Sequence, residues 1–138
     1  MGIAAKGIVM KTGDILAPLA IGRVSEETIR LWSEFLADPN PIHLDPAATA
    51  AMGLGHRVIS QGPANLAYVI NLLMANFPGK KIDSIATQFS DNVFAGDIAT
   101  AAGRVLSVDD DILTCEAWLE IEGRGRAIFC EATIRLEG

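Results

Sequence analysis

The sequence predicts a single α+β domain in which an antiparallel sheet packs against one long central helix. Helical patterns occupy the chain up to Pro78-Gly79, and strand patterns occupy the remainder. The 138 residues are 50% hydrophobic and 20% charged, with a mean hydropathy of +0.32. This size and composition are typical of one globular domain with a well-filled core, so residues 1–138 are predicted to form one domain.

The first helix is predicted to open at Val24-Ser25, with Ser25 as its cap, and to end by Ala37 or Asp38. Apolar residues at helical spacing give it one stripe, formed by Ile29, Trp32, Phe35 and Leu36. Pro39 disfavours helical geometry in the residue before it. The segment from Asp38 to Ile42, which holds a second proline, is therefore predicted to be a stiff, extended corner.

Two further helices are predicted to start at prolines, which suit the first helical position. Asp45-Pro46 begins a short helix that Gly53 ends. Gly62-Pro63 begins a long helix that is apolar around most of its axis as far as Phe77. Such a helix is suited to being wrapped by a sheet, and it is too short to cross a membrane comfortably.

Four strands are predicted after the helices: Ile82 to Phe89, Ile98 to Val108, Ile112 to Ile121 and Arg126 to Leu136. The last two alternate apolar and polar residues, as half-buried antiparallel strands do. A fifth strand is predicted from Lys6 to Met10. Cys115 and Cys130 fall in the last two strands, where reduced core thiols are expected and a bridge between neighbouring strands is the alternative.

The charge balance argues against two classes of partner. The net charge is −6 and the isoelectric point is near 4.8. No long-range field therefore draws the protein to nucleic acid or to an anionic membrane surface. The start of the sequence has no cationic leader followed by a long apolar block, so a cytoplasmic protein is expected.

One segment carries residues suited to catalysis: Asp38-Pro39-Asn40-Pro41-Ile42-His43. An acid-base pair must be held within reach of one substrate or water, and two prolines stiffen the segment that carries Asp38 and His43. An ordinary turn in which His43 makes a local hydrogen bond is the alternative, and spacing alone does not decide between them. Two histidines and two distant cysteines form no zinc motif, and no glycine-rich phosphate loop is present.

The residues from Phe35 to Gly53, FLADPNPIHLDPAATAAMG, resemble the signature of MaoC-like, R-specific enoyl-CoA hydratases, whose pattern is Gly-Asp-x-Asn-Pro-hydrophobic-His-x-Asp. Three other segments are similar to that family: Gly13-Asp14, Ser60-Gln61-Gly62, and Phe89 to Gly96-Asp97. The resemblance implies the hot-dog fold, a curled antiparallel sheet around one long helix.

The resemblance also implies a reaction and its residues. Asp38 and His43 would be the catalytic pair that adds water to trans-2-enoyl-CoA and gives (R)-3-hydroxyacyl-CoA, with their acid and base roles left open. The Gly62 N–H, at the positive end of a helix dipole, would stabilise the charge on the thioester oxygen. The implied substrate-binding residues are Asn40, Ser60 and Gln61. No metal or redox cofactor is implied, coenzyme A enters only with the substrate, and a homodimer or higher homo-oligomer is expected.

Four positions depart from the family pattern. Ala37 replaces a glycine, Gln61 replaces a frequent histidine, Pro63 replaces an apolar residue such as methionine, and Asp91 lies where relatives often carry a basic residue for a coenzyme A phosphate. The alternatives are therefore an (R)-3-hydroxyacyl-acyl-carrier-protein dehydratase, a non-catalytic subunit that shapes a partner's acyl pocket, and a thioesterase. The candidate phosphate contacts are Arg57, Lys80, Lys81 and Arg104.

Overall fold

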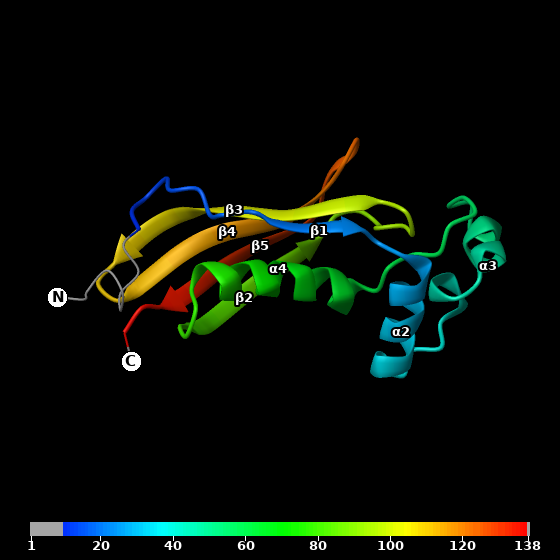
Figure 1. Cartoon of the computed structure of the whole chain (residues 1–138), viewed down its shortest axis with the longest axis horizontal. Coiled ribbons are helices and arrows are strands. Elements are labelled where there is room, and N and C mark those ends of the chain that lie inside the picture. The colour runs from blue at the N-terminus through cyan, green and yellow to red at the C-terminus, as the bar shows by residue number, and fades with distance from the viewer. Residues whose placement is uncertain (1–9, 138) are drawn as a thin grey trace.

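A curled antiparallel sheet and one long helix form the body of the protein (Figure 1). The computed structural model describes residues 10–137. The five strands lie in the order β1-β3-β4-β5-β2, and each neighbouring pair is antiparallel. Helix α4 runs along one face of the sheet, while α2 and α3 lie beyond one end of it (Figure 1). The predicted α+β arrangement around a central helix is confirmed.

The helices begin where the sequence places their caps. They are α2 (Glu26–Leu36), α3 (Pro46–Ala51) and α4 (Gly62–Asn76). The Ser25 hydroxyl accepts a hydrogen bond from Thr28 N, and the Asp45 carboxylate accepts one from Ala47 N. Helix α2 ends at Ala37, whose φ of 52° lies in the left-handed region. A glycine adopts this conformation without the steric cost that Ala37 bears.

The predicted extended corner is only partly correct. Residues Pro41–His43 form a 3-10 turn, η1, in place of extended chain. The Asn40 side-chain oxygen accepts a hydrogen bond from Ile42 N at 3.2 Å, and Leu44 N donates to Pro41 O at 2.9 Å. A local side-chain acceptor thus closes a turn that the two prolines alone do not specify.

The four predicted strands are confirmed, with ends that agree or differ by a single residue. They are β2 (Lys81–Phe89), β3 (Ile98–Asp109), β4 (Ile112–Ile121) and β5 (Gly125–Arg135). The first strand, β1 (Leu19–Arg23), was not predicted, because it is short and its pairing with β3 shifts register between Ala20 and Gly22. The strand predicted from Lys6 to Met10 falls on residues that lie, except for Met10, outside the described part of the chain.

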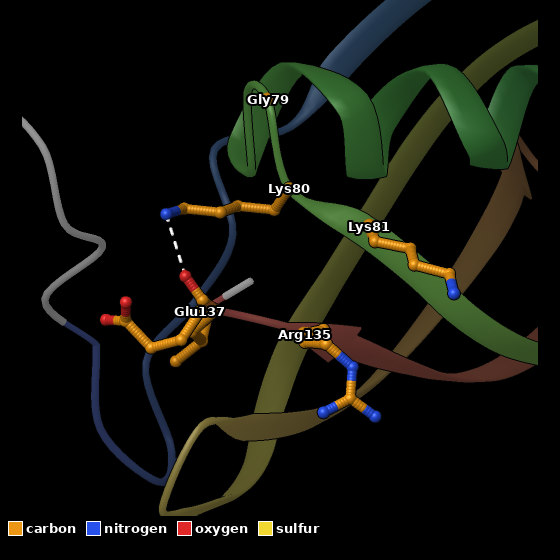
Figure 2. A pocket seen from close by; sticks show the side chains of 6 residues that line it. Gly79, Lys80, Lys81, Arg135 and Glu137 are labelled. Carbon is orange, nitrogen blue, oxygen red and sulfur yellow. Dashed lines mark hydrogen bonds between the residues drawn. The ribbon is translucent and has the colours of Figure 1, made fainter.

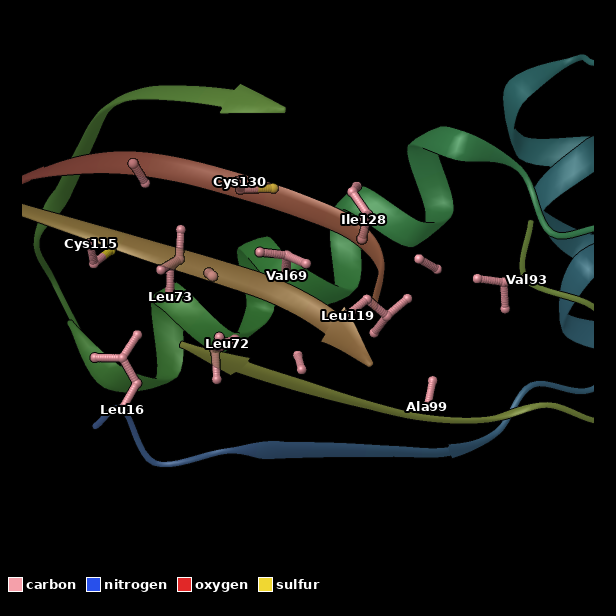
Figure 3. Close-up of a cluster of buried hydrophobic side chains, with 14 of the residues drawn as sticks. Leu16, Val69, Leu72, Leu73, Val93, Ala99, Cys115, Leu119, Ile128 and Cys130 are labelled. Carbon is pink, nitrogen blue, oxygen red and sulfur yellow. The ribbon is translucent and has the colours of Figure 1, made fainter. Parts of the chain in front are cut away.

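The core lies between α4 and the concave face of the sheet (Figure 3). Val69, Leu72 and Leu73 of α4 are fully buried, and they belong to one cluster with Leu119 of β4 and Ile128 of β5. Burial of each large aliphatic side chain stabilises the fold by about 1.5–3 kcal/mol. The sheet covers only this side of α4, since Met74 on the other side is 59% exposed. The expectation that the sheet wraps the helix is therefore only partly correct, because apolar residues around most of the axis do not by themselves determine how much of a helix is covered.

Both cysteines are free and buried in this core, as predicted (Figure 3). Cys115 lies opposite Ala132, and Cys130 lies opposite Ala117, so the two thiols occupy diagonal positions on β4 and β5. Burial, with a smaller contribution from the neighbouring Cys130, raises the pKa of Cys115 to about 12. The Cys115 thiol therefore stays protonated at neutral pH.

Side-chain amides hold both ends of α4. At the C-terminal end, Asn76 Nδ2 donates to Ala17 O, and Ala17 N donates back to Asn76 Oδ1, both at 2.9 Å. At the N-terminal end, Gln61 Nε2 donates to Ile29 O at 2.8 Å and to Ser33 Oγ at 2.9 Å. Helix α2 is thereby fixed against the start of α4, where the predicted site residues converge. Within residues 10–137, no helix is long and apolar enough to span a membrane.

Candidate active site

A buried backbone carbonyl fixes the His43 ring. His43 ends η1, is 8% exposed, and places Nδ1 2.6 Å from the carbonyl oxygen of Ile59. A carbonyl oxygen can only accept, so Nδ1 carries the proton of this hydrogen bond. In the neutral ring the lone pair is then on Nε2. Ile59 N also donates to Ile42 O at 2.9 Å, which holds the two segments together beside the ring.

The structure brings Asp38 to the free nitrogen of this ring. Asp38 Oδ2 lies 3.4 Å from His43 Nε2, and the Asp38 side chain is 38% exposed. The other carboxylate oxygen, Oδ1, accepts a hydrogen bond from Asn40 N at 3.1 Å. Asp38 N donates to Ser33 O at 2.9 Å, directly after the left-handed residue Ala37. The Asp38 carboxylate is thus anchored on one oxygen and presents the other to His43.

Both sequence interpretations of His43 are partly realised. The ring does make a hydrogen bond, but its acceptor lies 16 positions away along the chain and is not part of the local turn. This bond uses only Nδ1, so Nε2 remains available to a substrate or a water. An imidazole nitrogen and a carboxylate oxygen within 4 Å of each other can move and stabilise a proton together.

The Ser60 hydroxyl is buried beside the start of α4. Ser60 is 4% exposed, and its Oγ donates to Asn65 Oδ1 at 2.8 Å. Ser60 N donates to Val93 O at 2.7 Å. The contacts of Asn40 are those of the η1 turn. The assignment of Ser60 and Asn40 as substrate contacts stays a prediction.

Gln61 is turned towards α2, although the resemblance implies that it binds substrate. It is 1% exposed, and both hydrogen bonds of its Nε2 are made to Ile29 and Ser33 of α2. Its Oε1 is buried and has no hydrogen-bond partner within residues 10–137. Gln61 therefore joins two helices, and Oε1 is the part of its side chain left for a water or a substrate.

Gly62 is the first residue of α4, so its N–H has no acceptor within the helix. It follows Ile59, the residue that holds His43, by three positions. A Cβ at Gly62 would lie 3.2 Å from Cε1 of Phe89, the last residue of β2. The absence of a side chain therefore lets the Phe89 ring pack against Gly62, whose N–H lies at the positive end of the helix dipole.

Two open hollows lie along α2. One, of about 410 Å³, includes Asp38; its lining is Arg30, Ser33, Glu34, Ala37, Asp38, Pro39 and Leu44. The other, of about 360 Å³, is apolar and is lined by Thr28, Leu31, Trp32 and Phe35. Phe35 is 80% exposed, and its ring meets Trp32 edge-on at 5.7 Å between centroids. Apolar surface thus lies one helical turn from the Asp38 carboxylate.

The four cations considered as phosphate contacts all bind within the chain. Lys80 Nζ donates to Leu136 O at 2.8 Å in a hollow of about 200 Å³ (Figure 2), at the end of the fold away from Gly62. The other pairs are Arg57 with Asp97, Lys81 with Asp83, and Arg104 with Glu116. Asp91, expected to repel a phosphate, is bound by Arg124 at 2.7 Å. Its charge is therefore largely offset.

The sequence did not predict the roles of two residues beside the site, for different reasons. Ile59 contributes a backbone carbonyl, which every residue type possesses, so the sequence carries no signal of its role. Asn65 carries a signal, since a buried amide in the first turn of an apolar helix needs a partner, and that partner is Ser60. Among residues 10–137, no group of three or more His, Cys, Asp and Glu side chains is placed to hold a metal ion.

Comparison with known proteins identifies the family of this chain. A family model described as a MaoC like domain matches residues 17–114, a range that includes Asp38, His43 and Gly62. The fold and the match together define a hot-dog protein of the dehydratase type. The chain belongs to the MaoC-like domain family.

Solved structures confirm the hot-dog fold. An (R)-hydratase from A. caviae involved in PHA biosynthesis is 26% identical with a TM-score of 0.83, covering 93% of this chain and 98% of that one. R-hydratase PhaJ1 from Pseudomonas aeruginosa is 20% identical with a TM-score of 0.82, covering 94% and 86%. The ChsH1-ChsH2 complex from Mycobacterium tuberculosis is 18% identical with a TM-score of 0.84, covering 94% and 100%.

A curated relative is also similar in sequence. The mitochondrial 3-hydroxyacyl-[acyl-carrier-protein] dehydratase of Arabidopsis thaliana is 30% identical over 95 residues, which are 69% of this chain and 55% of that protein. The chain spans about half the length of this relative.

Proposed function

We propose that the protein is a hydro-lyase, an R-specific enoyl-CoA hydratase that reversibly adds water to trans-2-enoyl-CoA to give (R)-3-hydroxyacyl-CoA. One observation carries the proposal: His43 Nε2 faces Asp38 Oδ2 at 3.4 Å while the Ile59 carbonyl holds the proton on Nδ1. This tautomer leaves a basic nitrogen beside a carboxylate, which is the pairing that activation of a water requires.

In the hydration direction, the water oxygen forms a bond to C3 of the enoyl thioester, and His43 Nε2 takes one of its protons. The π electron pair of the C2–C3 double bond moves towards the thioester carbonyl, which forms an enolate. His43 then delivers its proton to C2, so one water supplies both the hydroxyl and the hydrogen. Asp38 orients the water and stabilises the imidazolium that exists between the two transfers.

The enolate places negative charge on the thioester oxygen, and Gly62 is assigned to stabilise it. The Gly62 N–H lies at the start of α4, where the helix dipole adds a partial positive charge. Removal of such a donor typically slows a reaction by roughly 10²- to 10³-fold. The missing side chain lets the thioester approach the backbone closely.

No step of this reaction requires a metal or redox cofactor, and coenzyme A takes part only as a portion of the substrate. A homo-oligomer, at least a dimer, is part of the proposal. Strand β2 is an edge of the sheet, and Phe89 at its end is 57% exposed beside Gly62. A second copy paired along β2 would cover this edge and the Phe89 ring.

A second candidate is dehydration of (R)-3-hydroxyacyl chains on acyl carrier protein. The Arabidopsis thaliana dehydratase, 30% identical over 95 residues, favours it. The same Asp38 and His43 would run the reaction in reverse, so only the carrier distinguishes the two. A non-catalytic subunit is disfavoured because such a subunit has no need of the ordered Asp38–His43 pair.

The test is the loss of conjugated enoyl-thioester absorbance when the purified protein meets crotonyl-coenzyme A or crotonyl-acyl carrier protein. Rapid loss with the coenzyme A ester, no free thiol, and an (R)-3-hydroxybutyryl product are expected. Preference for the carrier protein would move the assignment to the dehydratase, and release of free thiol would make the protein a thioesterase. Loss with neither substrate would overturn the proposal.

A further inference from the structure

We propose that Asp97 is a positioning residue for His43, acting through a clamp around the Phe94 ring. The Phe94 clamp consists of Phe94, Asp97, Arg57 and Arg124. It lies outside the residues that the resemblance assigns to the reaction. The inference rests on the proposed function, since it specifies what keeps the catalytic imidazole in place.

The clamp is built on one carboxylate. Asp97 Oδ1 accepts a hydrogen bond from Arg57 Nη1 at 3.1 Å, and Asp97 Oδ2 accepts hydrogen bonds from Phe94 N at 2.8 Å and from Arg124 Nη2. The guanidinium carbons of Arg57 and Arg124 lie 4.9 Å and 5.3 Å from the Phe94 ring centroid. Cation–π contacts of this length hold both arginines against the ring.

The Asp97 side chain is only 9% exposed, so its contacts are little screened by water. Two guanidiniums on one ring repel each other unless an anion lies between them. Asp97 provides that anion, and Asp91 binds Arg124 from the other side at 2.7 Å. The two carboxylates balance the charges of the two arginines. Both arginines can therefore stay on the Phe94 ring, which lies between them in the sequence.

The clamp is joined directly to the segment that holds His43. Phe94 and Ile59 form an antiparallel bridge. On either side of the bridge, Ser60 N donates to Val93 O at 2.7 Å and Ala95 N donates to Val58 O at 3.0 Å. The carbonyl of Ile59, the central residue, accepts the His43 Nδ1 proton at 2.6 Å.

A displacement of residues 93–95 would therefore move the Ile59 carbonyl and tilt the imidazole relative to Asp38. A misplacement of about 1 Å can slow catalysis by roughly 10²-fold even when the reacting groups are intact. The clamp thus acts on catalysis by orienting His43, without touching substrate or water.

The test is the Asp97→Asn variant, which keeps the side-chain shape but removes a charge and one acceptor. The Nδ1 proton of His43 is followed by NMR on protein labelled with ¹⁵N-histidine, where the exposed His56, the other of the two histidines, is the internal reference. We expect faster solvent exchange of the His43 proton, an unchanged His56, and a kcat lowered roughly tenfold with KM within about twofold.

Asp83→Asn is the matched control. Asp83 is also a partly buried carboxylate bound to an arginine at 2.7 Å, but it lies on β2 and its partner, Arg135, lines the hollow that contains Lys80. A loss of stability alone would lower the melting temperature of both variants and leave kcat and the His43 proton unchanged. If the clamp positions His43, both kcat and the exchange rate of the His43 Nδ1 proton change in Asp97→Asn, and neither changes in Asp83→Asn.

Arg57→Gln is a second variant in case Asp97→Asn does not fold, because the Arg57 side chain is 52% exposed. It is expected to change both readouts in the same direction by a smaller factor. A folded variant with the wild-type His43 exchange rate and kcat would overturn the inference. If the wild type has no hydratase activity, the proposed function fails, while the His43 exchange rate still decides whether the clamp holds the ring.

Discussion

Gln61→Glu is the most informative single substitution at the junction of α2 and α4. The change replaces an amide nitrogen by oxygen and leaves the shape of the side chain intact. Gln61 is 1% exposed, and Nε2 donates at 2.8 Å and 2.9 Å to acceptors on α2. A carboxylate cannot donate to either acceptor, and the existing Oε1 already lacks a partner within residues 10–137.

The expected loss follows from these contacts. Two hydrogen bonds contribute about 0.5–1.5 kcal/mol each, and an uncompensated buried charge costs about 3–5 kcal/mol. We therefore expect Gln61→Glu to lower the free energy of unfolding by about 4–8 kcal/mol at pH 8. Gln61→Leu loses the same two hydrogen bonds but introduces no charge, so its loss is expected to be about 1–3 kcal/mol.

The sign of the pH dependence follows from burial. Burial raises the pKa of the introduced carboxyl in the folded state above its unfolded value of about 4.3. Below about pH 4 the group is neutral in both states and can donate one hydrogen bond, so the destabilisation is smallest there. The destabilisation then grows with pH until the folded-state pKa is passed.

The assay is urea unfolding of the wild type and both variants at pH 5 and pH 8, compared at equal pH. The reasoning predicts a larger deficit for Gln61→Glu at pH 8 than at pH 5, and a Gln61→Leu deficit that does not depend on pH. A Gln61→Glu variant within 1 kcal/mol of the wild type at pH 8 would refute it.

Three further predictions concern Ala37, Gly62 and Cys115. Because Ala37 has φ 52°, Ala37→Gly should raise the free energy of unfolding by up to about 1 kcal/mol in thermal denaturation. A lower free energy of unfolding would contradict backbone strain at Ala37. Gly62→Ala should lower kcat/KM by roughly tenfold or more while changing stability by under about 1 kcal/mol, since the exposed Phe89 ring can yield; unchanged kinetics would argue against close approach of the thioester. Because burial raises the pKa of Cys115 to about 12, alkylation at pH 8 should be slow and should accelerate in urea; fast alkylation of the native protein would contradict its burial.

The sequence predicts most of the fold because the residues that start its helices act locally. Ser25, Asp45 and Pro63 mark helix starts by chemistry that acts within one turn, and the structure places the three helices there. Strand β1 was missed because a five-residue segment with a register shift at Gly22 has little period of its own. Its partner β3, nearly 80 positions later, determines it.

The candidate site is predictable only in its side chains. The residue types of Asp38 and His43 are suited to an acid-base pair and the resemblance implies one, but spacing alone does not decide. The orientation of the His43 ring depends on the Ile59 carbonyl, which every residue type possesses, so the sequence does not indicate it. Gln61 is a similar case. A glutamine before a helix is compatible with a cap or a ligand, and the sequence does not indicate that its Nε2 donates to Ile29 and Ser33 of α2.

The central claim is that Asp38 and His43 act as one unit in adding water to an enoyl thioester. The most direct measurement is the initial rate of crotonyl-coenzyme A hydration by Asp38→Asn, His43→Ala and the double variant, with His56→Ala as the control at the other histidine. Each single change should lower kcat by roughly 10²- to 10⁴-fold, and the double variant should fall no further than the slower single one. Undiminished hydration in either single variant, or a double loss equal to the product of the single losses, would contradict the account.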